Sequence, residues 1–161
     1  MSPSNAPTAV APVPAGYHSV TPYLCVNDAS RAIDFYTQAF DAHETQRMTG
    51  PNGKIGHAEV RIGSSPVMLA DEYPDMGFLS PTTLGGPGLT LLLYVADVDA
   101  VFAKAIAAGA EALRPVHVEF YGDRTGTLRD PFGHVWHVSS RVEDVPPDEL
   151  RSRAQKAMAG G

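Results

Sequence analysis

A chain of 161 residues, with 43% apolar and 19% charged residues, has the size and composition of one globular domain. Its net charge of -6 argues against a nucleic-acid or anionic-membrane partner, because both require a basic surface. The single cysteine, Cys25, excludes an internal disulfide, and no apolar run is long enough to span a bilayer, so a cytoplasmic location is expected.

The chain begins with a segment expected to be a disordered tail, followed by a first unit of regular structure. Residues 1–16 hold four prolines and no basic residue, which is not the pattern of a signal or transit peptide. Residues 18–26 predict a strand, and Asp28 is a favourable N-cap for a helix after it. Strands expected at 43–49, 54–63 and 66–72 complete a β-α-β-β-β unit.

The second half is expected to repeat this order. Residues 72–88 are rich in proline and glycine and predict a link between the halves without regular structure, which could also cover a binding site. A strand follows at 89–95, and Asp97 is the N-cap of a second helix. Three more strands are predicted near 113–118, 121–129 and 133–139. A final helix with a narrow apolar stripe is predicted near 146–159.

The repeat is visible in the residues themselves. Leu24, Val26 and Asp28 return later as Leu93, Val95 and Asp97, and the helix residues after them match as well. A repeat of this length is not a solenoid unit, since solenoid repeats run to roughly 20–50 residues and need three or more copies. Two copies indicate a pseudo-symmetric domain, and the ligand is expected where its halves face each other.

Two such units, with helices opened by Asp28 and Asp97 and a hairpin at residues 130–134, resemble the vicinal oxygen chelate superfamily (glyoxalase, bleomycin resistance, dioxygenase). Segments 22–24, 57–63, 68–71, 121–124 and 130–136 look like its PhnB-like branch. The resemblance implies an α+β fold in which two βαβββ modules form a cup-shaped mixed sheet. Its domain spans 17–140, with halves of about 17–72 and 88–140, a tail at 1–16 and a C-terminal helical extension at 141–161.

The resemblance also implies a test for metal binding, because metal-using members carry ligands on the first and last strands of each half. These positions fall here on Thr21, Thr90, Leu69 or Ala70, and His137. Only His137 is a usual ligand for a divalent ion. No metal and no other cofactor are therefore expected, and a divalent metal is disfavoured.

His57 and Glu59 lie two residues apart on a predicted strand, so their side chains share a face. With His137 they could form a polar cluster inside an apolar cup, acting in acid-base chemistry or as an alternative metal site. The other interpretation is a hydrogen-bonded pair that fixes the strand edge, or a solvated outer face.

Strand alternation divides the remaining candidates. Tyr23 should lie on the ligand face and Leu24 on the helix face, with Trp136 in the core. A one-residue slip would reverse every such assignment. Such a lining would suit a flat, partly aromatic ligand. The alternative interpretation is that these side chains only fill the interior of the cup. The expected lining residues are Thr21, Tyr23, His57, Glu59, Met68, Thr90, Leu92, Tyr94, Tyr121 and His137.

Two functions follow from the resemblance. The preferred hypothesis is a metal-free small-molecule-binding protein, a homodimer whose subunits complete the cavities, serving drug or natural-product sequestration. The alternative is a lyase, isomerase or thiol transferase in which His57, Glu59 and His137 are catalytic. A third possibility, a protein-interaction module, depends only on the C-terminal helix.

Overall fold

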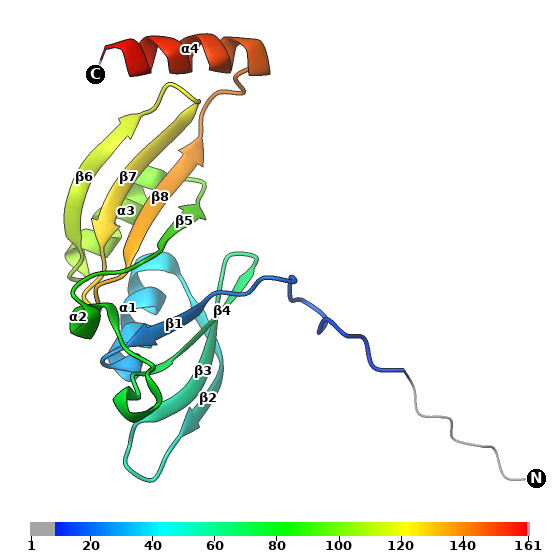
Figure 1. The fold of residues 1–161 in the computed structure, drawn as a ribbon, viewed down its shortest axis with the longest axis vertical. Coiled ribbons are helices and arrows are strands. Elements are labelled where there is room, and N and C mark those ends of the chain that lie inside the picture. Colours follow the sequence, from blue (N-terminus) through cyan, green and yellow to red (C-terminus); the bar gives the residue numbers. More distant parts are fainter. Residues whose placement is uncertain (1–8, 161) are drawn as a thin grey trace, which may run out of the picture.

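The structure is a computed structural model that describes residues 9–160, so residues 1–8 of the predicted tail lie outside it. Both halves of the chain contain the same elements in the same order (Figure 1). The first half contains β1 (Tyr23–Val26), α1 (Ala29–Phe40), β2 (His43–Thr49), β3 (Ile55–Ile62) and β4 (Ser65–Asp71). The second half contains β5 (Thr90–Tyr94), α3 (Val98–Ala107), β6 (Glu111–Val118), β7 (Asp123–Arg129) and β8 (Val135–Arg141).

Both predicted helix starts are confirmed. The Asp28 carboxylate accepts a hydrogen bond from the Arg31 amide at 3.1 Å, and Asp97 accepts one from the Ala100 amide at the same distance. Each bond satisfies an amide that has no partner within its own helix.

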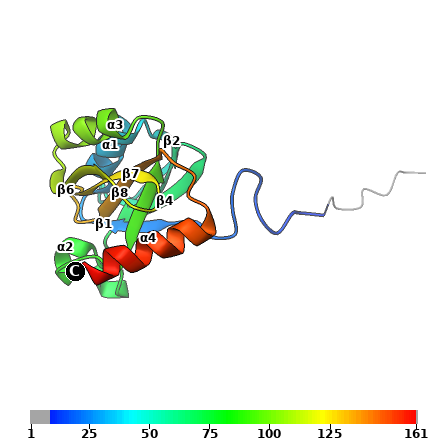
Figure 2. The same cartoon turned by 90° about the horizontal axis from the view of Figure 1, so that it is seen from above.

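The strands form two four-stranded mixed sheets, each built from one half of the chain. The first sheet has the order β1-β4-β3-β2 and the second β5-β8-β7-β6, with β1–β4 and β5–β8 parallel and the other pairs antiparallel. Helices α1 and α3 contact each other on the same side of the two sheets (Figure 2). The predicted α+β fold of paired βαβββ modules is therefore confirmed. We call the side of each sheet away from its helix its open face.

The predicted strand phase is also confirmed. Leu24 is 3% exposed and packs in the core under α1, whereas Tyr23 is 46% exposed on the open face. On β5, Leu91 and Leu93 pack against the core while Leu92 is exposed. The strand expected from residue 18 begins only at Tyr23, because Pro22 has no amide hydrogen to donate to a neighbouring strand.

The prediction of no regular structure for 72–88 is wrong at two places. A 3-10 helix, η1, covers Pro74–Met76, and a four-residue helix, α2, covers Pro81–Leu84. Pro81 has a backbone angle already suited to a first helical turn, and Gly85 ends the helix with φ of +89°.

A buried polar cluster joins the two modules. The Asp130 carboxylate, 3% exposed, accepts hydrogen bonds from the Tyr36 hydroxyl of α1 at 2.6 Å and from the Trp136 indole at 2.9 Å. It also accepts the amides of Phe132 and His134 at 2.9 and 3.0 Å. Burial is the main reason that the pKa of Tyr36 lies well above its usual value, and the adjacent Asp130 carboxylate raises it further. The Tyr36 hydroxyl therefore remains a donor.

The C-terminal helix α4 (Pro147–Ala159) confirms the predicted helix there and has no buried residue. It is held mainly through Arg153, whose guanidinium pairs with Glu143 at 2.7 Å and donates to the Phe120 carbonyl at 3.1 Å. Between residues 9 and 160, no helix has both the length and the apolar character needed to cross a bilayer.

Candidate functional site

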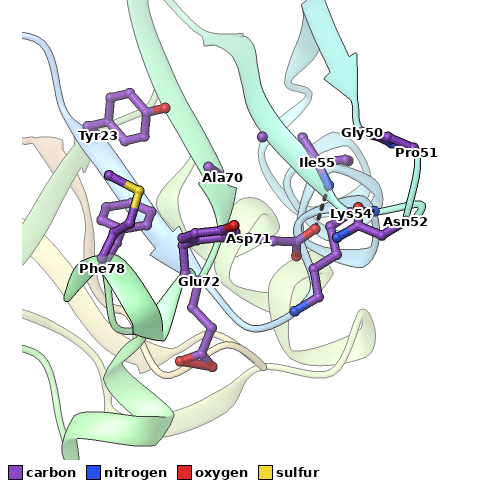
Figure 3. Close-up of a pocket in the computed structure, with 13 residues that line it drawn as sticks. Tyr23, Gly50, Pro51, Asn52, Lys54, Ile55, Ala70, Asp71, Glu72 and Phe78 are labelled. Atoms are coloured by element: carbon purple, nitrogen blue, oxygen red, sulfur yellow. Dashed lines mark hydrogen bonds between the residues drawn. The ribbon is translucent and has the colours of Figure 1, made fainter.

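A cavity of about 980 Å³ opens at one end of the first sheet, where β1, β4 and the β2–β3 turn meet the segment after β4 (Figure 3). Its wall is largely apolar and aromatic. The Tyr23 and Phe78 rings meet edge to face with centroids 5.8 Å apart. The lining residues are Tyr23, Gly50, Pro51, Asn52, Lys54, Ile55, Gly56, Ala70, Asp71, Glu72, Tyr73, Met76 and Phe78.

The two carboxylates of the cavity are already engaged by the protein. Asp71 accepts the amides of Ala29 and Ile55, each at 2.7 Å, and so ties α1 and β3 to β4. Glu72 accepts the Thr83 hydroxyl at 2.7 Å, and this bond is the main reason that the pKa of Glu72 is lowered, with the nearby Lys54 charge adding to it. Lys54 itself forms no ion pair with any residue between 9 and 160.

A line of hydrogen bonds runs across the open face of the first sheet and ends at the cavity wall. The Tyr17 hydroxyl donates to one oxygen of Glu59, whose other oxygen is 3.3 Å from Nε2 of His57. Nδ1 of His57 is 2.8 Å from the Tyr23 hydroxyl. Glu59 is only 6% exposed, because the N-terminal segment lies over it.

The hydrogen-bond directions along this line follow from Glu59. The hydrogen bond from Tyr17, followed by contributions from His57, lowers the pKa of Glu59 despite its burial. A carboxylate only accepts hydrogen bonds, so the His57 tautomer that satisfies both contacts carries its hydrogen on Nε2 and accepts at Nδ1. Desolvation raises the pKa of Tyr23, which stays protonated and donates to Nδ1.

Comparison with known proteins identifies the family. Residues 16–138 match the family model described as Glyoxalase/Bleomycin resistance protein/Dioxygenase superfamily. The chain belongs to this superfamily. An uncharacterized protein of Mycobacterium bovis, Mb0911c, is 44% identical over 137 residues, which cover 83% of this chain and 90% of that protein.

Solved structures show the same fold. TioX from Micromonospora sp. ML1 has a TM-score of 0.60 and 25% identity, over 80% of this chain and all (100%) of TioX. A Bacillus cereus PhnB protein, described as a putative 3-demethylubiquinone-9 3-methyltransferase, has a TM-score of 0.61 and 21% identity. The match covers 76% of this chain and 99% of the PhnB protein. The expected superfamily is thereby confirmed, and the PhnB protein shares the fold.

The donor set at the superfamily's metal positions does not fit a metal ion. Thr21 lies just before β1 and Thr90 begins β5. Of the two candidates on β4, Leu69 lies in the core, which leaves Ala70 beside the cavity. Within residues 9–160, no group of three or more His, Cys, Asp or Glu side chains is placed to hold an ion.

His137 lies in the second sheet, where its Nδ1 contacts the Thr127 hydroxyl at 3.0 Å. It does not join His57 and Glu59 within one chain.

The expected lining residues divide between the two sheets. Thr21, Tyr23, His57, Glu59 and Met68 belong to the first module, and only Tyr23 among them also lines the large cavity. The others lie in the second module: Thr90, Leu92, Tyr94, Tyr121 and His137.

The sequence prediction missed several functional candidates. Tyr17 was assigned no contact, and Phe78, Tyr73 and Met76 were part of the linking segment. The sequence does contain a signal for the last three residues, because three large apolar side chains in a short proline- and glycine-rich segment indicate an apolar contact or binding surface.

Proposed function

We propose that this protein is a cytoplasmic, metal-free binding protein for small, largely apolar and partly aromatic molecules, acting in sequestration of a drug or natural product. The observation that supports the proposal is the aromatic cavity at the end of the first sheet. Its volume of about 980 Å³ suits a drug-sized ligand. The Lys54 ammonium at its edge provides a counter-charge for an anionic group on such a ligand (Figure 3).

The cavity is tested with an anilinonaphthalene sulfonate dye, which combines an aromatic body with an anionic group. We expect Phe78→Ala to weaken dye binding about tenfold, because the edge-to-face contact with Tyr23 and the buried ring area are both lost. Fluorescence titration gives the dissociation constant. The matched control is Phe120→Ala, since Phe120 is 36% exposed on the second module. Equal loss in both variants would mean that the dye binds elsewhere.

We also propose that the protein is a homodimer whose subunits complete each other's cavities. Strands β1 and β5 are sheet edges, each hydrogen-bonded to a neighbour on one side only. Beside these edges the open faces carry large apolar side chains, with Leu92 51% and Tyr94 61% exposed. Such edges and patches are usually covered in a soluble protein, and a second copy supplies the matching surface. The catalytic alternative needs a second copy to bring His137 to the His57–Glu59 pair, because His137 lies in the other sheet.

Leu92→Arg is expected to raise the dimer dissociation constant at least about tenfold, because it places a charge in an apolar contact. Sedimentation velocity over a range of protein concentrations measures the change. The control is Leu113→Arg on β6, at the opposite edge of the same sheet and 41% exposed. A wild-type chain that sediments as a monomer at all concentrations would contradict the dimer.

A further inference from the structure

The line of hydrogen bonds on the first sheet has the geometry of a proton relay. Its inner end is the buried Glu59 carboxylate, its middle is His57, and its outer end is Tyr23, which lines the cavity and is 46% exposed. The Tyr23 hydroxyl lies 2.8 Å from Nδ1 of His57. Because this hydroxyl donates its only hydrogen to His57, the lone pairs of the Tyr23 oxygen remain available to accept a hydrogen bond.

We infer that Tyr23, His57 and Glu59 form a proton-accepting relay, and that the cavity binds a weakly acidic aromatic ligand, a phenol or an enol, as its anion. This inference deepens the binding function proposed above and depends on it. The ligand hydroxyl hydrogen-bonds to the Tyr23 oxygen, its O–H bond breaks, and the proton passes to that oxygen. The original Tyr23 proton moves to Nδ1 of His57. The products are the ligand anion and an imidazolium paired with the Glu59 carboxylate, so charge and protons balance.

The charges around the relay suit this outcome. Glu59 stabilises an imidazolium at 3.3 Å, and the Tyr17 hydroxyl keeps Glu59 ionised from the opposite side. Arg61, next along the same face of β3, donates to the carbonyls of Ser64 and Gly16 and is directed away from His57. In the cavity, Lys54 is the cation that favours a bound anion, whereas Asp71 and Glu72 are engaged elsewhere.

The relay is not a general feature of the repeated fold. The strand registers align Tyr23 and Glu59 through Met68 in the first sheet, and Leu92 and Thr127 through His137 in the second. The second sheet therefore carries Leu92 and Thr127 where the first carries Tyr23 and Glu59. The second sheet instead pairs Tyr94 with Asp123 and His137 with Thr127, so none of its hydrogen bonds within residues 9–160 places a histidine between a tyrosine and a carboxylate.

The test uses 4-nitrophenol at a pH below its own pKa, because its phenolate has a separate visible absorbance band. We expect the wild-type protein to produce the phenolate band on binding, with calorimetry giving the affinity. 4-Nitroanisole, which has the same ring but no hydroxyl hydrogen, should bind about tenfold more weakly, since it cannot form the charged hydrogen bond. A bound nitrophenol that stays neutral overturns the relay.

Two variants locate the proton. His57→Gln and Tyr23→Phe should each abolish the phenolate band, and circular dichroism confirms that both are folded. The matched control is His117→Gln, because His117 also pairs with a carboxylate, Glu119, at 2.7 Å but on β6. A phenolate band that survives in folded His57→Gln or Tyr23→Phe also overturns the relay. Binding of both probes without the band leaves the binding function intact, whereas no binding of nitrophenol, nitroanisole or the dye overturns both proposals.

Discussion

Replacing Asp130 by alanine is expected to lower the free energy of unfolding by about 4 kcal/mol, a large part of the total for a domain of this size. Asp130 accepts four hydrogen bonds, and its removal leaves the Tyr36 hydroxyl, the Trp136 indole and two backbone amides buried without an acceptor. Urea unfolding followed by the fluorescence of Trp136, the one tryptophan in the sequence, measures the loss beside the altered site.

The control for this experiment is Asp144→Ala. Asp144 is also an aspartate in an ionic contact, with Arg141 at 3.3 Å, but its side chain is 94% exposed. Exposed pairs contribute little, so the change should stay within about 0.5 kcal/mol. A loss below about 1 kcal/mol for Asp130→Ala would show that the cluster does not join the modules.

Gly122→Ala is expected to cost about 3 kcal/mol and to release the segment that carries α4. Gly122 has φ of +100°, and a Cβ added there would lie 2.3 Å from the carbonyl oxygen of Glu143. The Gly122 carbonyl also accepts the amides of Val142 and Glu143, at 2.9 and 3.1 Å. Urea unfolding measures the stability loss, and limited proteolysis should show cleavage between residues 142 and 160.

Gly85→Ala separates the two causes of this effect. Gly85 has a similar φ of +89°, but apart from its chain neighbours no atom of residues 9–160 lies within 4 Å of an added Cβ. Its substitution should therefore cost only the conformational strain, about 1 kcal/mol. If the two variants lose equal stability, the close approach of Glu143 is not the cause.

Local signals predicted much of this fold. The helix starts at Asp28 and Asp97 follow from a short acceptor side chain placed before an apolar helical stripe. The phase of β1 follows because only Leu24 and Val26 are suited to a helix-covered face, which fixes Tyr23 on the other side. Both signals lie within a few residues of the feature that they specify.

The candidate site was less predictable because its contacts are distant in sequence. The pairing of His57 and Glu59 follows from strand alternation, but the contacts of Tyr17 with Glu59 and of Tyr23 with His57 require the register of the folded sheet. The cavity depends in addition on the path of the segment after β4, which no periodic pattern describes. Likewise, no residue pattern specifies that β1 and β5 remain separate edges within one chain.

The confinement of every strand pairing to one half of the chain has a consequence for synthesis on the ribosome. The first sheet needs nothing beyond Asp71, the last residue of β4 that pairs with β1. It can therefore close, with α1 over it, while the second half is still being translated. Tyr17, Glu59, His57 and Tyr23 all belong to this first module, whereas the α1 surface, Tyr36 and the Cys25 carbonyl take partners from the later half. Translation thus delivers the half that contains the cavity first, and the second half then packs against it through α3 and Asp130.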